Sequence, residues 1–198
     1  LQIRRGEIVG VAGLVGSGRS ELAQVIFGIT PAESGEILVD GKPVRIRRPA
    51  DAMNLGIAYV PEDRGTQGLI RQMRIRENVS LAMLRQLARG AFIRFGAERK
   101  LAQETIRQLN IRAYSYDQIV NKLSGGNQQQ VVVGKWLARK PRVLIMDEPT
   151  RGIDVGAKAE IHRLMSELAQ QGMAAVMISS GLPEGLGMCQ PNLGMPHG

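Results

Sequence analysis

Residues 123–154 read LSGGNQQQVVVGKWLARKPRVLIMDEPTRGID, and this stretch decides the fold. A serine and two glycines precede a predicted helix over 128–138, where unsatisfied backbone N–H groups can face an anion. An apolar run over 143–146 predicts a buried strand, and Asp147 and Glu148 follow it directly. Because open α/β sheets bind ligands at the carboxyl ends of their strands, this order predicts two contributions to phosphate binding.

Strand and helix patterns alternate on both sides of this stretch. Apolar runs predict strands over 7–12, 36–39, 57–60, 143–146 and 174–179. Helical spacing predicts helices over 20–27, 128–138 and 157–170, with one or two further turns over 49–54. This alternation implies an α/β core in which helices cover a largely parallel sheet.

Residues 62–122 differ in character from the rest of the chain. They are rich in Arg, Gln, Leu and Ala and contain few strand formers. Helical spacing recurs over 75–87 and 98–109. We interpret 62–122 as a helical lobe inserted into the α/β core. The boundaries that follow are 1–188 for the domain, with a core over 1–61 and 123–188, and 189–198 for an irregular tail.

The composition excludes some classes of protein and leaves one question open. No apolar run in the 198 residues approaches the roughly 20 that span a bilayer, so any membrane role would depend on a partner. Cys189 is the only cysteine, which excludes an internal disulfide and fits a reducing compartment. The net charge of +8 fits either an anionic partner or a solvated basic face. Aromatic residues make up 4% of the chain, which disfavours a base-stacking platform for single-stranded nucleic acid.

A second phosphate-binding motif lies near the start of the chain. Residues 13–20 read GLVGSGRS, which fits the pattern G-x-x-x-x-G-K-[ST] except that Arg19 replaces the lysine. Its glycines let backbone N–H groups converge on phosphate oxygens, and Ser20 is positioned to bind Mg²⁺. Taken alone, the motif could also be a plain glycine turn. The residues expected to bind nucleotide here are Gly13, Gly16, Ser17, Gly18, Arg19, Ser20 and Glu21.

Two residues of this loop should weaken nucleotide binding. The guanidinium of Arg19 is wider than the ammonium of lysine and needs more room beside a phosphate. Glu21 places a carboxylate in the first helical turn, where it repels a triphosphate. We therefore expect this loop to bind nucleotide less tightly than a lysine loop.

Five motifs together carry a resemblance to a known family. They are GLVGSGRSE at 13–21, PEDR at 61–64, LSGGNQQ at 123–129, DEPTRGIDVGAK at 147–158 and ISS at 178–180. Over 1–188 the chain resembles the nucleotide-binding domain of ABC transporters. It is most similar to the second ATPase half of bacterial monosaccharide importers of the ribose, galactose, xylose and arabinose type. The resemblance implies a P-loop NTPase fold of the ABC ATPase type with an inserted helical lobe, and a chain truncated at both ends.

The resemblance also implies roles for the acidic strand end. Asp147 would hold Mg²⁺ together with Ser20, and Glu148 would polarise the attacking water as general base.

It implies a different role for the residues ahead of the 128–138 helix. Ser124, Gly125 and Gly126 would close over an ATP held by the phosphate loop of a partner domain. Asn127 stands where many members have Gln, and Asp154 matches the loop that crosses the dimer interface.

Two positions depart from the commonest pattern of the family. Glu62 stands where a glutamine usually couples the site to the helical lobe. Ser179-Ser180 stands where Ser-His usually supplies a histidine to the γ-phosphate. His162 falls inside a predicted helix and His197 in the tail, so we expect this switch histidine to be absent. The chain's own site should then bind ATP and hydrolyse it slowly.

The expected function is that of an ATP-binding domain in a sugar importer, with ATP and Mg²⁺ as cofactors and ATP hydrolysis in the full complex. The isolated chain should be weak or inactive. By resemblance, the partners are the first ATPase half of the transporter, the membrane permease subunits and, indirectly, a periplasmic sugar-binding protein. The same resemblance implies no nucleic acid and a peripheral location at the cytoplasmic face of the bacterial inner membrane. Two alternatives stay open: a soluble ABC ATPase acting on nucleic acid or ribosomes, and a non-hydrolysing regulatory domain.

Overall fold

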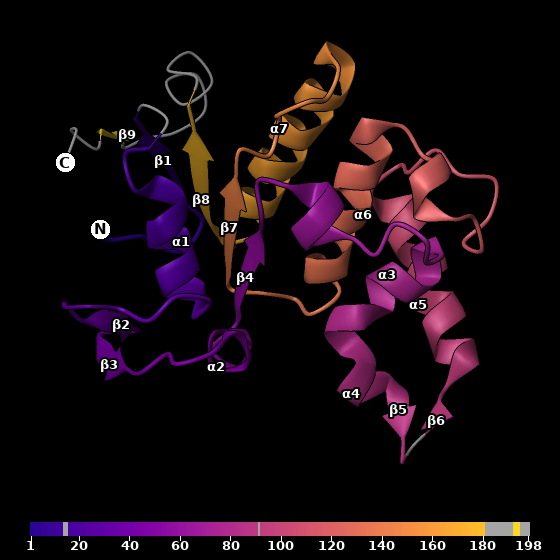
Figure 1. Cartoon of the computed structure of the whole chain (residues 1–198), viewed down its shortest axis with the longest axis horizontal. Coiled ribbons are helices and arrows are strands. Elements are labelled where there is room, and N and C mark those ends of the chain that lie inside the picture. The colour runs from indigo at the N-terminus through magenta and orange to yellow at the C-terminus, as the bar shows by residue number, and fades with distance from the viewer. Residues whose placement is uncertain (14–15, 91, 181–191, 195–198) are drawn as a thin grey trace. The chain divides into compact units, whose positions relative to one another are not determined.

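The computed structural model describes residues 1–13, 16–90, 92–180 and 192–194 (Figure 1). These residues form two compact units. Unit 1 takes Leu1–Glu62, Pro141–Pro149 and the described residues from Met165 onward. Unit 2 takes Asp63–Lys140 and Thr150–Leu164. The helical lobe over 62–122 stays a prediction. Unit 2 overlaps it and also includes the helix that follows Ser124.

Unit 1 is built on a parallel sheet of five strands in the order β4-β7-β8-β1-β9, with β8 between β7 and β1 (Figure 1). The strands are β1 Ile8–Ala12, β4 Ile57–Val60, β7 Val143–Asp147, β8 Ala174–Ser179 and β9 Asn192–Gly194. All residues of β4 and β8 are buried, which explains why their sequences are continuous apolar runs rather than alternating ones. The predicted α/β class with a largely parallel sheet is confirmed.

The strand register brings three strand ends to one edge of the sheet. Ala12 of β1 lies opposite Ser179 of β8, and Asp147 of β7 lies opposite Ile178 of β8. The loop after β1 therefore starts beside the acidic end of β7. This is the edge at which the sequence predicted a phosphate site.

The remaining elements of unit 1 are two helices and a hairpin. Helix α1 Arg19–Phe27 packs against β4 and β7, and α2 Pro49–Asn54 packs against β4. Strands β2 Ile37–Val39 and β3 Lys42–Val44 pair antiparallel across Asp40-Gly41. Both turn residues have positive φ, 52° and 72°, as a two-residue hairpin turn requires. The turn was predicted from the sequence, but β3 was not, because Lys42-Pro43 has no strand signal.

Strand β9 corrects the prediction of an irregular tail over 189–198. Asn192–Gly194 pair in parallel with Gly10–Ala12 of β1. An extended segment can pair with the open edge of β1 through backbone groups alone, so such a strand needs no periodic pattern of apolar side chains by which it could be predicted. The rest of the predicted tail lies outside the described residues.

Unit 2 is mainly helical. Its elements are a π-helical turn η1 Arg64–Gly68, helices α3 Ile75–Ser80, α4 Leu84–Leu87, α5 Phe95–Gln108 and α6 Gly125–Leu137, 3₁₀ turns η2 Leu81–Met83 and η3 Val120–Lys122, and a hairpin of β5 Ala88–Arg89 with β6 Phe92–Ile93. Helix α7 Val155–Gln170 begins in unit 2 and ends in unit 1. The helix predicted over 75–87 is interrupted after Ser80. The Ser80 hydroxyl donates to the Glu77 carbonyl and so competes with the helical pattern.

Helices α3, α5 and α6 pack on one another to form the core of unit 2. Gly134 of α6 allows close approach to α5, because a Cβ there would overlap Thr105 and lie 3.0 Å from Leu109. Glu98 of α5 is 2% exposed, and its carboxylate accepts hydrogen bonds from Arg76 and Ser80 of α3. A buried carboxylate without such partners would strongly destabilise the unit.

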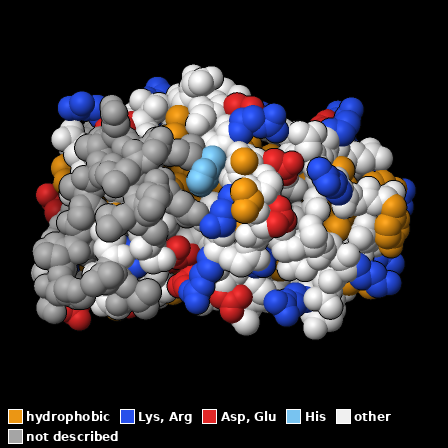
Figure 2. All heavy atoms as spheres, turned by 90° about the horizontal axis from the view of Figure 1, so that it is seen from above, with side chains coloured by type: hydrophobic (Ala, Val, Ile, Leu, Met, Phe, Trp, Pro, Cys, Tyr) orange, Lys and Arg blue, Asp and Glu red, His pale blue; other side chains and the backbone are white. Residues whose placement is uncertain are grey.

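No helix among the described residues combines the length and the apolar content that crossing a bilayer requires. On the face shown in Figure 2, Lys and Arg side chains are interspersed with Asp and Glu side chains. The two interpretations of the positive net charge, an anionic partner or a solvated face, therefore both stay open.

The contact between α5 and α6 can be tested by Gly134→Ala. Alanine favours a helix over glycine by about 1 kcal/mol, but the added methyl overlaps Thr105, so we expect a net loss of about 1–3 kcal/mol in unfolding free energy. The control is Gly96→Ala in α5, where a Cβ would meet nothing within 4 Å. This variant should gain about 0.5–1 kcal/mol. Urea denaturation followed by circular dichroism measures both, and equal effects of the two substitutions would contradict the packing.

Candidate functional site

The loop after β1 has the backbone geometry of a phosphate cradle. Gly16 and Gly18 have φ values of 86° and 81°, a left-handed conformation that favours glycine. A Cβ at either position would meet nothing within 4 Å, so the space in front of both glycines is open. Gly13 precedes this turn, and Leu14 and Val15 lie outside the described residues. The turn leads into α1, whose N-terminal N–H groups favour an anion.

Ser17 precedes α1, and the first helical turn holds the remaining predicted residues of this loop. Ser17 Oγ is buried and, among the described residues, has no hydrogen-bond partner. Such an orphaned hydroxyl fits a phosphate oxygen. Glu21 is exposed and lies in the first turn, as the sequence predicted.

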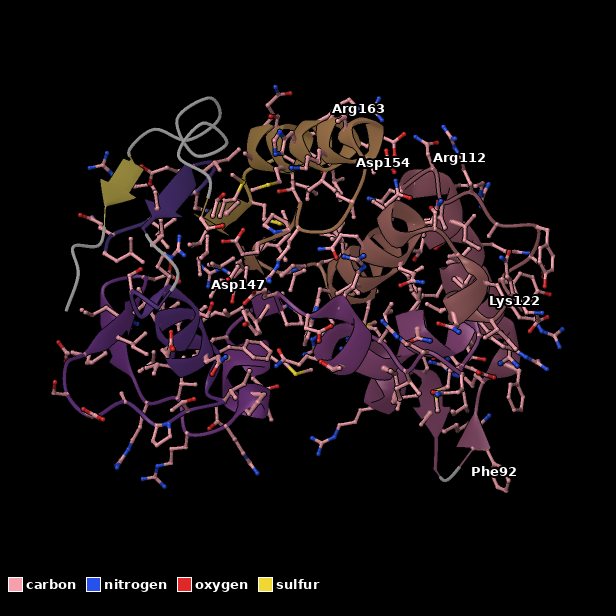
Figure 3. The ribbon with its side chains drawn as sticks, turned by 45° about the horizontal axis from the view of Figure 1, so that its top comes forward. Phe92, Arg112, Lys122, Asp147, Asp154 and Arg163 are labelled. Carbon is pink, nitrogen blue, oxygen red and sulfur yellow. The ribbon has the colours of Figure 1, made fainter. Side chains whose placement is uncertain are left out.

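Asp147 is fully buried at the end of β7, where it is labelled in Figure 3. Its Oδ2 accepts a hydrogen bond of 3.1 Å from the hydroxyl of Tyr59 on the neighbouring strand β4. Burial raises the pKa of Asp147 above its usual value, while hydrogen bonds from Ser20 and Tyr59 act to lower it. Burial, and then the charge of Asp147, raise the pKa of the Tyr59 hydroxyl. Tyr59 therefore acts as a fixed hydrogen-bond donor to the carboxylate.

Ser20 and Asp147 fit a magnesium ion. The second carboxylate oxygen of Asp147, Oδ1, is buried without a hydrogen-bond partner in the described part of the chain. A hydroxyl and a carboxylate oxygen are ligands that Mg²⁺ prefers, and Mg²⁺ usually keeps water and phosphate oxygens as its other ligands. No cluster of three or more His, Cys, Asp or Glu side chains occurs within 1–13, 16–90, 92–180 and 192–194. Any Mg²⁺ here would thus need oxygens from a bound phosphate and from water.

Arg19 is held by the sheet edge. Its side chain is 6% exposed, and Nη1 donates a 2.5 Å hydrogen bond to the backbone carbonyl of Ser179, 160 residues away. The residue that replaces the lysine is therefore tied to the end of β8. This bond would compete with a phosphate for the guanidinium.

Glu148 is also held by the end of β8. Its φ of 45° is unusual for a residue with a side chain, and its N–H donates to the carbonyl of Ile178. One oxygen of its carboxylate accepts a 2.5 Å hydrogen bond from the backbone N–H of Ser180. Thus Ser180, which stands where the family usually has a histidine, binds the predicted general base through its main chain.

In unit 2 the serine–glycine segment, Ser124–Gly126, forms the N-terminus of α6. The Ser124 oxygen accepts hydrogen bonds from the backbone N–H of Asn127 at 3.4 Å and from its side-chain amide at 2.7 Å. The amide oxygen of Asn127 accepts from the backbone N–H of Arg112 at 2.6 Å. With both lone pairs of the hydroxyl used, Ser124 is left to act as a donor, which suits an anion.

The two glycines of this segment are required by close packing. A Cβ on Gly126 would lie 2.5 Å from Cβ of Ala157 in α7. A Cβ on Gly125 would lie 2.9 Å from Nη2 of Arg64 and 3.2 Å from the carbonyl oxygen of Gly152. The N-terminal ends of α6 and α7 therefore lie in direct contact.

A pocket of about 220 Å³ opens between these two helix ends. Arg112 and Asp154, both labelled in Figure 3, line it together with Ser124 and Gly126. Asp154 caps α7 by accepting a hydrogen bond from the N–H of Ala157 at 2.9 Å. Two helix N-termini and Arg112 favour an anion in this hollow, while the carboxylates of Asp154 and Glu160, which also line it, oppose one.

The structure therefore divides the predicted residues between two sites. It brings the phosphate loop, Asp147 and Glu148 together in unit 1, and Ser124, Gly125 and Gly126 together in unit 2. His162 lies half-buried within α7, and Glu62 lies two residues after the end of β4. The roles predicted for all these residues stay predictions.

Sequence reasoning missed Tyr59, Arg64 and Arg112. Tyr59 carried one usable signal: it lies in a predicted buried strand, where a hydroxyl needs a partner. Arg64 belongs to the PEDR motif at 61–64, but the motif gave no sign that its side chain would bind the carbonyls of Arg151 and Gly152. Arg112 lies in an irregular segment of a basic chain, and nothing in the sequence distinguishes it from a solvated arginine.

Comparison with known proteins gives a consistent result. The model of the family described as ABC transporter matches residues 1–151. The ribose import ATP-binding protein RbsA of Geobacillus kaustophilus is 56% identical over 186 residues, which cover 94% of this chain and 38% of that protein. A putative ribose/galactose/methyl galactoside import ATP-binding protein of Agrobacterium fabrum is 52% identical over 187 residues, again covering 94% and 38%. The chain thus spans about two fifths of the length of these relatives.

Solved structures agree with the fold. The ATP-binding cassette MJ0796, in a dimeric post-hydrolysis state bound to ADP and Pi, has a TM-score of 0.80 and 26% identity, covering 98% of this chain and 83% of that chain. The ADP conformation of the cassette MJ1267 has a TM-score of 0.81 at 22% identity, covering 98% and 78%. The second likeness concerns the fold alone.

The environment of Asp147 can be tested by Asp147→Asn. Burial raises the pKa of this carboxyl, so its ionised form destabilises the native state at pH values above that pKa. The amide stays neutral and keeps an oxygen for Tyr59. We expect the variant to have the higher unfolding free energy at pH 7, with the difference shrinking as the pH falls through the raised pKa toward 3.8.

Asp63→Asn is the matched control with the opposite sign. Hydrogen bonds from Thr66 and Gly65 lower the pKa of the exposed Asp63 carboxyl, so the parent should be the more stable at pH 7. That advantage should be lost as the pH falls below 3.8. Urea titrations across pH 3–7 measure both variants. An Asp147→Asn chain less stable than the parent at every pH would contradict the assignment.

Proposed function

Because the chain belongs to the ABC transporter family, we propose that it is the second ATP-binding domain of a bacterial monosaccharide importer. The names of its relatives support a sugar of the ribose or galactose class as the cargo of the whole transporter. The relatives are sugar import proteins, so the alternative of an ATPase acting on nucleic acid or ribosomes is not favoured. The remaining three fifths of such a polypeptide would carry the first ATPase half.

The observation that carries this proposal is the arrangement of Ser124, Gly125 and Gly126 at the N-terminus of α6. The Ser124 hydroxyl is oriented as a donor by Asn127, and the two glycines that open α6 carry no side chain of their own in front of the helix N-terminus. The phosphate loop of unit 1 already has its own helix N-terminus, so this second anion-binding segment is best explained by a nucleotide held on another domain. The dimeric cassette bound to ADP and Pi supports such an assembly.

In this assembly the two ATP sites differ. In one site the first half supplies the phosphate loop and this chain supplies Ser124–Gly126, whose donors stabilise charge on the γ-phosphate. We propose that this site performs most of the hydrolysis. The first half, by symmetry, lends its own serine–glycine segment to the loop at 13–21.

The chain's own site would bind ATP and hydrolyse it slowly. Backbone N–H groups of the glycine loop and Ser17 would bind the phosphates, and Ser20 and Asp147 would hold Mg²⁺, which stabilises charge on the phosphate oxygens. Glu148 would orient a water molecule for attack, but the Ser180 N–H competes for its carboxylate. Arg19 is likewise engaged by Ser179. Both contacts disfavour turnover at this site.

Closure of the two halves over ATP would then drive transport. We propose that unit 2 passes this closure to the permease subunits at the cytoplasmic face of the inner membrane, with a periplasmic binding protein delivering the sugar.

The assignment of roles can be tested in the full transporter. Ser124→Arg places a bulky cation against the donors of α6 and should abolish sugar uptake and ATP hydrolysis. Arg19→Ala changes only the slow site, where the bond from Arg19 to Ser179 already competes with phosphate. We expect this variant to retain more than about a tenth of the parental rates of uptake and hydrolysis. Ser34→Arg, at an exposed loop position, controls for the added charge and size.

Uptake of labelled ribose and release of phosphate are the measurements, with nucleotide binding as a check on folding. If Arg19→Ala stopped transport while Ser124→Arg did not, the roles of the two sites would be reversed.

A further inference from the structure

Arg64 makes a two-point contact with the loop that precedes α7. Its Nη1 donates to the carbonyl of Arg151 at 2.9 Å, and its Nη2 donates to the carbonyl of Gly152 at 3.0 Å. The planar fork of a guanidinium can serve two successive carbonyls at once, which the single ammonium of lysine cannot do in the same way. Gly152 has a φ of 66°, a conformation that turns this loop sharply at the contact.

The same guanidinium lies against the serine–glycine segment. A Cβ on Gly125 would come within 2.9 Å of Nη2 of Arg64, so the absence of a side chain at 125 makes room for the arginine. Arg64 thus touches the first residue of α6 and the loop that leads into α7. These are the two helix ends that form the 220 Å³ pocket.

The turn that carries Arg64 is itself firmly anchored. At its start, Asp63 accepts hydrogen bonds from the N–H groups of Gly65 at 2.8 Å and Thr66 at 3.2 Å. At its end, the Gly68 carbonyl accepts a 2.6 Å hydrogen bond from the buried Nζ of Lys135 in α6. Burial lowers the pKa of Lys135 to about 8, because the charged ammonium is costly to desolvate. The hydrogen bond to the Gly68 carbonyl offsets part of this cost. Arg64 is therefore not a freely moving surface arginine.

We propose that Arg64 is a positioning residue for the serine–glycine segment. It holds Ser124–Gly126 and the 151–154 loop in one fixed arrangement, so that the N-termini of α6 and α7 face a phosphate together. The arginine touches no reacting atom and acts through the backbone it binds. This inference rests on the proposed function in one respect, namely that the phosphate belongs to an ATP on the partner half.

The chain alone provides the first test, which needs no partner. In Arg64→Ala, amide hydrogen exchange of residues 151–157 and 124–127 should accelerate about tenfold or more, because the loop loses both hydrogen bonds from the charged guanidinium. Arg64→Lys can bond one carbonyl at a time and should give an intermediate rate. Arg85→Ala, at an exposed arginine of α4, is the control and should exchange like the parent.

Assembly with the first ATPase half provides the second test. With Mg²⁺ and ATP present, Arg64→Ala should weaken association about tenfold or more, whereas its affinity for ATP as an isolated chain should match the parent. A purely structural role would instead lower the melting temperature and accelerate exchange throughout unit 2.

The outcomes separate the two proposals. If 151–157 exchange in Arg64→Ala and Arg64→Lys as they do in the parent, the positioning role is overturned. Failure of the parent chain itself to associate with the first half would count against the proposed function, while the exchange result on the isolated chain would still decide the role of Arg64.

Discussion

A buried carboxylate at the end of a parallel strand is the constraint on which unit 1 depends. Asp147 has no exposed surface, and an ion in that position requires hydrogen-bond donors or a cation. The sheet order supplies Tyr59 from the neighbouring strand, and the register with β8 and β1 brings Ser20 close by. The fold thus gathers a polar site at one edge of the sheet, while the residues of β1, β7 and β8 ahead of that edge stay apolar. The second carboxylate oxygen of Asp147 has no hydrogen-bond partner among the described residues and is free to bind a cation.

Unit 2 depends on the opposite device, the absence of side chains. Gly125 and Gly126 allow an arginine and a neighbouring helix to approach a helix N-terminus more closely than any other residue would permit. Asn127 then fixes the direction of the Ser124 hydroxyl by donating two hydrogen bonds to its oxygen. Unit 1 places its ligand oxygens by strand register, whereas unit 2 brings two helix N-termini together because Gly125 and Gly126 lack Cβ atoms. The two sites therefore tolerate different kinds of substitution.

The sequence was sufficient for features that are local along the chain. The strands over 57–60 and 174–179 and the glycine turn before α1 follow from apolar runs and from glycine spacing, so they were predictable. The pairs Tyr59–Asp147 and Arg19–Ser179 span 88 and 160 residues, and only the sheet order brings them together. Strand β9 was missed because backbone pairing needs no side-chain pattern. The roles given to the site residues come from family resemblance, and the structure contributes their geometry.

The bond from the Ser180 main chain to Glu148 limits how this site could evolve. Every amino acid except proline carries the same amide hydrogen, so grafting an imidazole at 180 would leave the glutamate still tethered. A gain of catalytic competence would require the backbone at the tip of β8 to take another path. Both natural evolution and protein engineering would therefore have to change the backbone path or the loop length here before a new side chain at position 180 could have an effect.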